Sequence, residues 1–205
     1  MTAHDAPTRL DRSDTIGMYA TVGIALIAVI ATVWQVALRL GEVLPLRDVP
    51  VLVPFLDEPA ELPIGPDGAP VTVDVDQAIV TVPDPAAATG FALVAEPIVH
   101  GAAVIAGVVL LALFCWNLAR GRAFSRANVR IVMWGTGVLA AGWLLGSILT
   151  SMTVNGALSA VSDYTYEGIT FSTDWAVPFA ILALGAVGAA FQIGARLQRD
   201  TEGLV

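Results

Sequence analysis

Glu96 and His100 are the two residues whose types and spacing most clearly suggest chemistry in this chain. They stand four positions apart, so on a helix their side chains share one face. A carboxylate and an imidazole on one face of a membrane helix can bond to each other, handle a proton or hold a cation. The alternative is structural, because Glu96 precedes Pro97 and could be solvated or pair with Arg39. We favour the structural interpretation.

Residue counts argue against several enzyme classes. Cys115 is the only cysteine, so disulfide exchange lacks a pair of thiols. His4 and His100 are expected on opposite sides of the membrane, which excludes a bis-histidine haem within one chain and argues against a multi-histidine metal site. Asp74 and Asp76 form a D-x-D without the glycine and glutamate of a calcium loop. With no lysine, P-loop or dinucleotide fingerprint either, we expect no catalytic residue, cofactor or metal, and no enzyme.

The elements that position these residues are long apolar segments. Of the 205 residues, 56% are hydrophobic and 14% are charged, which is typical of a membrane protein. Four runs, 15–38, 97–119, 131–151 and 175–195, have the roughly 20 apolar residues needed to cross about 30 Å of hydrocarbon. We therefore predict a four-helix bundle with transmembrane helices at 15–40, 91–120, 129–153 and 174–197. The first run is too long for a signal peptide and lacks a small-residue cleavage site.

Charge predicts the orientation of these helices. Eight of the ten arginines lie in the expected tails 1–14 and 198–205, in the turn 121–128 or at the adjoining helix ends. Thirteen of the eighteen acidic residues lie in or beside the expected loops 41–90 and 154–173. Because basic residues near helix ends stay on the cytoplasmic side, both termini are predicted to be cytoplasmic in a bacterial cell membrane.

The loop 41–90 is too long for a structureless connection, and its pattern predicts a small extracytoplasmic β element. Valines alternate with polar residues over 71–75, and the apolar phase then flips for 78–82. A two-residue turn at Asp76 and Gln77 would bring both sets onto one side of a hairpin; one long bulged strand is the alternative. The run 49–55 offers a further strand and 164–171 a fourth, giving a hairpin or a three- to four-stranded sheet.

Small residues mark the faces on which the helices are expected to approach each other closely. We predict packing within the chain rather than a dimer interface. The steps concerned are Ala103 with Gly107, Gly142 with Gly146, and Gly185 with Ala189.

The segment from Gly121 to Arg130 is the most distinctive short sequence. Ser125 is the expected N-cap of the following helix, and the arginines are expected at lipid headgroups or at a partner: Arg120, Arg122, Arg126 and Arg130. The pattern G-x-x-F-S-x-x-N-V-R between two apolar helices resembles the turn of a bacterial four-helix membrane family catalogued as a domain of unknown function, DUF2975. The ending from Leu197 to Val205 is similar too. The resemblance implies a topology and suits a role in membrane-side sensing, and it implies no reaction.

Two functions from different classes follow from these patterns. The first is a non-enzymatic membrane module, for sensing, partner binding or as an accessory subunit, that uses its outer β element. The second is a small oligomeric transport or permeation unit in which Glu96 and His100 handle protons or a cation. We favour the first, with membrane lipids and an unidentified protein as partners and no nucleic acid.

Overall fold

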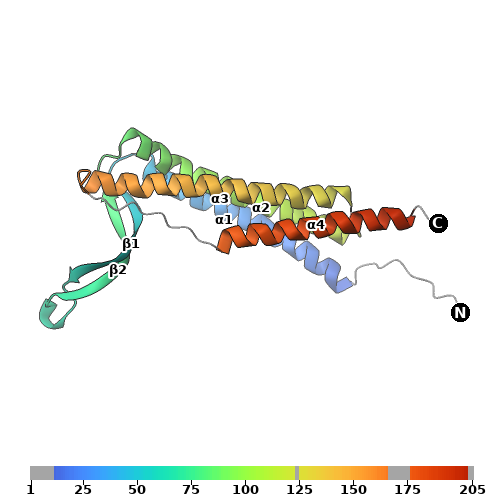
Figure 1. Ribbon diagram of the computed structural model, residues 1–205, viewed down its shortest axis with the longest axis horizontal. Coiled ribbons are helices and arrows are strands. Elements are labelled where there is room, and N and C mark those ends of the chain that lie inside the picture. Colours follow the sequence, from blue (N-terminus) through green and yellow to red (C-terminus); the bar gives the residue numbers. More distant parts are fainter. Residues whose placement is uncertain (1–11, 123–124, 166–175, 203–205) are drawn as a thin grey trace. The chain divides into compact units, whose positions relative to one another are not determined.

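A computed structural model describes residues 12–122, 125–165 and 176–202 of the chain. In these residues four α-helices are long and apolar enough to cross a membrane, and one antiparallel sheet lies between the first and the second of them along the chain (Figure 1). The elements are α1 (Arg12–Val43), β1 (Val49–Leu62), the 3-10 helix η1 (Pro66–Gly68), β2 (Val71–Val82), α2 (Ala87–Ala119), α3 (Arg126–Val161) and α4 (Ala176–Glu202). The prediction of four helices that are long and apolar enough to span a membrane is confirmed.

All four helices extend beyond the predicted membrane segments, α4 by continuing to Glu202. α1 continues to Val43, α2 begins at Ala87, and α3 continues to Val161. The added residues of α1 and α3 include the buried Val43, Val154, Ala157 and Leu158, so these helix ends gain tertiary contacts that hydropathy alone does not reveal. α3 ends where Asp163 and Tyr164 take positive φ angles of 50° and 62°.

The chain divides by its contacts into two units. The first comprises residues 1–35, 100–143 and 175–205, and thus contains α4 and parts of the other three helices. Aromatic contacts join its helices: Tyr19 meets Trp116 edge to face at 5.4 Å, and Phe114 meets Phe191 at 5.5 Å between ring centroids. Such pairs stabilise packing by about 0.5–1.5 kcal/mol beyond the area they bury.

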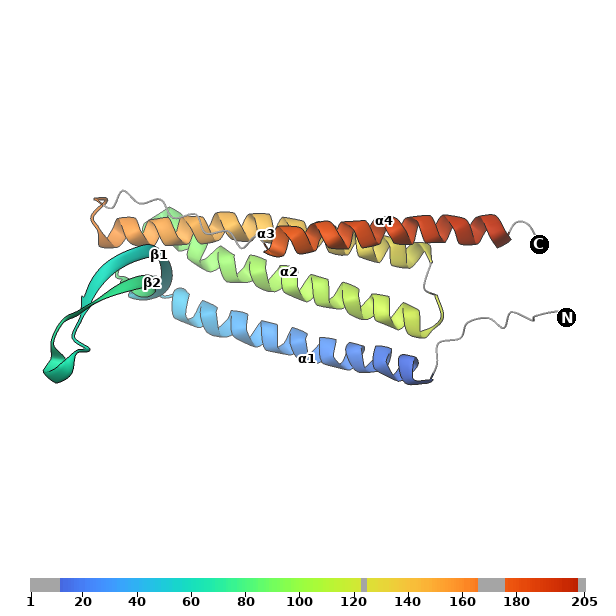
Figure 2. The ribbon, with the colours of Figure 1, turned by 60° about the horizontal axis from the view of Figure 1, so that its bottom comes forward.

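The second unit comprises residues 36–99 and 144–174 and holds the sheet. β1 and β2 form one antiparallel pair, and Figure 2 shows the two strands curving together. Their register pairs Val49 with Val82 and Leu62 with Val71, with a shift between Pro54 and Glu58 of β1. The prediction of a small antiparallel β element is confirmed.

The predicted turn at Asp76 and Gln77 is wrong. Both residues lie inside β2, and Gln77 is paired with Pro54. The alternative of one long, irregular strand is correct, because the apolar phase flips at the register shift and keeps Val75 and Ala78 on the less exposed side. The turn lies instead at η1, where Asp67 and Gly68 have φ angles of 58° and 77°. Of the predicted strand at 164–171, Tyr164 and Thr165 are outside any strand, and 166–171 falls outside the described residues.

One end of the sheet is anchored in an apolar cluster with the ends of three helices. Every second residue in this part of β1 belongs to the cluster: Val49, Val51 and Val53 are at most 2% exposed. The buried helix and β2 residues that complete it are Val43, Val82, Leu93, Val154, Ala157 and Leu158. Because an isolated hairpin is only marginally stable in water, this anchorage gives β1 and β2 a defined position within the second unit.

Candidate functional site

Glu96 is held by α3. Its Oε1 accepts a hydrogen bond from the Thr150 hydroxyl at 2.7 Å, and its Oε2 accepts one from the Thr153 hydroxyl at 3.0 Å. The three residues are partly or fully buried in the second unit. Both carboxylate oxygens are therefore satisfied by hydroxyls one turn apart on a single helix, an arrangement that ties α2 to α3.

The structure gives His100 and Arg39 no part in this contact. His100 is exposed, and no hydrogen bond or ion pair joins it to Glu96 among the described residues. Arg39 binds elsewhere: its Nη1 donates to Glu42 Oε2 and its Nη2 donates to the Pro50 carbonyl, each at 3.0 Å. The arrangement supports the structural interpretation of Glu96.

We expect the Glu96→Leu variant to be less stable in detergent by about 1–3 kcal/mol, because it removes the acceptors of two partly buried hydroxyls. Glu96→Gln should lie closer to wild type, since its amide still offers an acceptor to Thr150 or Thr153. His100→Ala is the control on the same helix and should leave stability unchanged. Thermal unfolding in one detergent measures all three, and equal losses for Glu96→Leu and His100→Ala would contradict the structural role.

Most of the small residues predicted at helix contacts lie close to a neighbouring helix or are buried. A Cβ built on Gly142 of α3 would collide with the Ala103 Cβ of α2, and one on Gly107 would lie 3.7 Å from Leu139 Cδ2. Gly146 is buried as well. On α4, Gly185 lies near Thr136, and Gly188 makes the close approach, with its added Cβ 3.3 Å from Val132 Cγ1. Ala189, which we expected on this face, is exposed.

A further close approach in the second unit was missed by the sequence analysis. A Cβ added to Gly156 would lie 2.7 Å from Thr89 Cγ2 and 2.9 Å from Thr89 Cβ, so α2 and α3 touch there with no room for a side chain. Thr89 is 6% exposed. Gly156 and Ala160 form a small-residue step like that of Gly185 with Ala189, so the sequence did carry a signal for this contact.

The turn between α2 and α3 is built around the fully buried Asn128. Its Oδ1 accepts a hydrogen bond from Asn117 Nδ2 at 2.8 Å, and its Nδ2 donates to the Arg122 carbonyl at 3.0 Å. The Asn128 N–H donates to Ser125 Oγ at 3.2 Å, which confirms Ser125 as the N-cap of α3. Gly121 ends α2 with φ 72° and reverses the chain. The motif that carries the family resemblance is thus a structural device of the turn.

The arginines of this turn are exposed, and their guanidinium groups can contact lipid or a partner. Arg120, Arg122, Arg126 and Arg130 all present exposed side chains, and none forms an ion pair with a described carboxylate. Arg120 stacks over the Trp116 ring with 4.6 Å from Cζ to the centroid. Cations beside an aromatic ring at a helix end suit a contact with lipid headgroups.

The outer face of the hairpin is the side of β1 and β2 opposite the apolar cluster. At its centre the cross-strand pair Leu52 and Ile79 is 57% and 70% exposed. Their neighbours on this face are Pro50, Pro54, Gln77 and Thr81, none of which is buried. Two large aliphatic side chains are therefore exposed on strands whose opposite face is buried in the apolar cluster.

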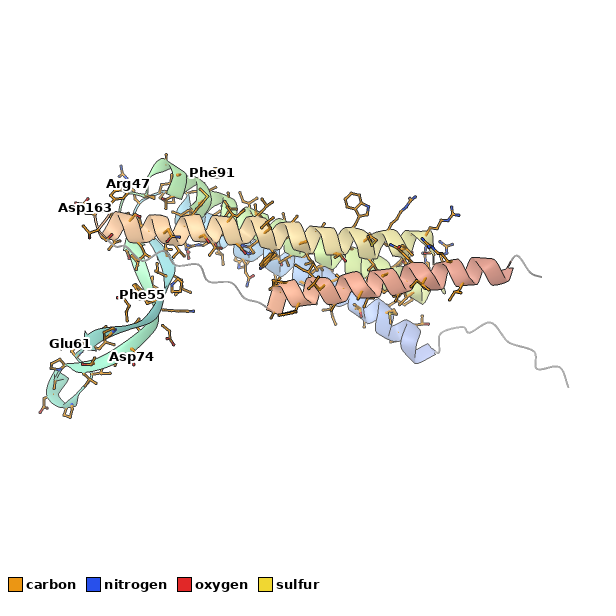
Figure 3. The ribbon with its side chains drawn as sticks, viewed as in Figure 1. Arg47, Phe55, Glu61, Asp74, Phe91 and Asp163 are labelled. Carbon is orange, nitrogen blue, oxygen red and sulfur yellow. The ribbon has the colours of Figure 1, made fainter. Side chains whose placement is uncertain are left out.

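The hairpin is also strongly acidic. Residues 49–82 include six carboxylates and no arginine, lysine or histidine: Asp57, Glu58, Glu61, Asp67, Asp74 and Asp76. Glu61 and Asp74 lie on the half of the hairpin farther from the helix ends of the second unit, as Figure 3 shows. No group of three histidine, cysteine or acidic side chains in the described part of the chain is close enough to hold a metal ion. Along the sequence, five of these acidic residues belong to β1 or β2, and Asp67 belongs to the turn η1.

The chain matched no protein-family model, no curated protein and no solved structure. The site must therefore be interpreted from its own residues.

Proposed function

We propose that this protein is a non-enzymatic membrane module that binds a partner protein through the outer face of its β1–β2 hairpin. The observation that carries the proposal is the exposed Leu52–Ile79 pair on a hairpin whose opposite face is buried among helix ends. Exposed aliphatic pairs on a fixed support are typical of interaction sites. Such a module serves as a sensor, a docking subunit or an accessory subunit.

The proposal places the protein in a bacterial cell membrane with four spans and both termini in the cytoplasm. The arginine-rich turn then lies at the cytoplasmic leaflet, where Arg120, Arg122, Arg126 and Arg130 contact lipid headgroups or a partner. The acidic hairpin lies on the extracytoplasmic side. Membership in the DUF2975 family remains a prediction that rests on the Gly121–Arg130 turn and the short ending.

The contacts of Glu96 favour this function over transport of protons or cations. A transport site needs a carboxylate that faces a water-filled cavity and works with its neighbours. Glu96 instead uses both oxygens to bind Thr150 and Thr153 of one helix, and His100 does not take part.

Co-purification from native membranes tests the binding function. We expect full-length wild-type protein in mild detergent to retain a stoichiometric partner, identified by mass spectrometry. The double variant Leu52→Ser with Ile79→Ser should lose at least about tenfold of that partner, since burying each aliphatic side chain is worth about 1.5–3 kcal/mol and 1.4 kcal/mol is a factor of ten.

The matched control is Leu62→Ser with Val71→Ser, a second cross-strand pair that lies near the turn, beyond the register shift, and is 42% and 39% exposed. It removes similar aliphatic groups and should keep the partner. Amide exchange of β1 and β2 verifies that both double variants retain the sheet. Recovery of the protein alone in every form, or an unchanged partner with the outer-face variant, would contradict the proposal.

A further inference from the structure

The two edges of the hairpin differ in their capacity to accept another strand. β1 carries Pro50, Pro54 and Pro59, while β2 carries no proline. Proline has no N–H, so in an antiparallel pair it cannot stand where two residues exchange both main-chain bonds. The pairing nevertheless runs through Pro50, opposite Thr81, and through Pro54, opposite Gln77. These positions therefore direct their main-chain groups away from the partner strand.

The free edge of β1 is blocked in consequence. It lacks donors at its three prolines, and the Pro50 carbonyl already accepts a hydrogen bond from Arg39 Nη2 at 3.0 Å. Prolines on an edge are a common protection against the addition of further strands. Leu52 is the one position between Pro50 and Pro54 that keeps an outward N–H.

The free edge of β2 is open. Thr81, Ile79 and Gln77 stand opposite Pro50, Leu52 and Pro54, so their own N–H and C=O groups also point outward. All three side chains are exposed, and no hydrogen bond joins their main chain to another described segment. The same geometry applies to Asp74, opposite Pro59. β2 thus offers a row of unpaired donors and acceptors beside the apolar side chain of Ile79.

We infer that the free edge of β2 binds an extended, basic segment of a partner protein as a third strand. This inference rests on the proposed binding function and specifies its geometry. Strand addition takes its affinity from main-chain bonds and its specificity from alternate side chains. Six carboxylates and no cation between residues 49 and 82 select a basic occupant. A second copy of the chain would bring six further carboxylates to the same place, so charge disfavours pairing of β2 with itself.

The test uses a synthetic peptide of about ten residues that alternates valine and arginine, which is long enough to follow most of a strand like β2. Its binding to the full chain in neutral detergent is measured by fluorescence anisotropy. The matched variants are Ile79→Pro and Leu52→Pro, which lie directly opposite each other and each remove one outward N–H. Amide exchange checks that the β1–β2 ladder persists in both.

We expect Ile79→Pro to weaken peptide binding by about tenfold or more, because the proline removes a donor and crowds the incoming strand. Leu52→Pro should weaken binding no more than Leu52→Ser does, because both remove the same side chain from the outer face and the free edge of β1 takes no strand. The same peptide with N-methyl groups on alternate residues should bind as weakly to wild type as the parent peptide binds to Ile79→Pro. An acidic analogue that alternates valine and glutamate should not bind.

Three results would overturn the inference. The first is that the basic peptide does not bind, and the second is that the two proline variants have equal effects. The third is that the wild-type protein is a dimer in detergent and Ile79→Pro converts it to a monomer, because this result would assign the edge to a second copy. The proposed function is judged separately: if the two prolines act alike while Leu52→Ser with Ile79→Ser still loses the native partner, the outer face binds without strand addition.

Discussion

Replacing Gly142 or Gly156 with leucine should lower the stability of the protein in detergent more than any other single change on α3. Gly142 is in contact with the Ala103 side chain, and Gly156 with Thr89, so that even a Cβ does not fit at either place. Overpacking of a close contact costs about 1–3 kcal/mol and occasionally more. Both helices must shift to admit four additional carbon atoms, and we therefore expect the upper end of this range or failure to fold.

The control for this prediction is Gly137→Leu, on the same helix. A Cβ on Gly137 meets nothing within 4 Å, and the residue is exposed. Leucine there should be neutral or slightly stabilising, because glycine weakens a helix by roughly 1 kcal/mol relative to better helix formers. Thermal unfolding of the three variants in one detergent gives the comparison. Unfolding temperatures for Gly142→Leu and Gly156→Leu that match wild type would refute close packing at both contacts.

Asn128→Ala should be the most damaging substitution at the α2–α3 turn. It leaves the Asn117 amide and the Arg122 carbonyl without the partners that they have inside the turn. Each buried polar group left unsatisfied costs about 1–3 kcal/mol, so the combined loss should reach about 2–5 kcal/mol. Thermal unfolding in detergent measures this loss, and limited proteolysis at the turn should accelerate in parallel.

The loss of stability of Asn128→Ala is compared with that of Ser125→Ala, a milder change at the same turn. It removes only the acceptor of the Asn128 N–H and should cost about 1 kcal/mol, as for other helix caps. Asn128→Asp keeps an acceptor for Asn117 but loses the donor to the Arg122 carbonyl, and should fall between the two. If Asn128→Ala is no more harmful than Ser125→Ala, the buried amide does not organise the turn.

The helices and the turn could be predicted from the sequence because their signals are local. Apolar runs define the spans, and Ser125 three residues before Asn128 is a recognisable cap. The partners of Glu96 could not be predicted in this way. Thr150 and Thr153 lie more than fifty residues away along the chain, and their hydroxyls face Glu96 only once α2 and α3 are packed.

The hairpin shows how a local signal can mislead. The apolar phase flip at Asp76 and Gln77 suggested a turn, although glutamine is a poor residue for positive φ. The Pro66-Asp67-Gly68 sequence was the stronger turn signal, because aspartate and glycine both tolerate the left-handed region that this turn uses. The flip itself reflects an irregularity in the pairing of two long strands, and such an irregularity depends on the partner strand β1.

Photo-crosslinking in native membranes is the most direct test of the claim that the outer face of the hairpin binds a partner protein. A benzophenone side chain replaces Ile79 on the outer face in one protein and Leu62, near the turn, in a second. We predict a discrete protein adduct from position 79 and little or none from position 62. Adducts only to lipid from position 79, or equal protein adducts from both positions, would contradict it.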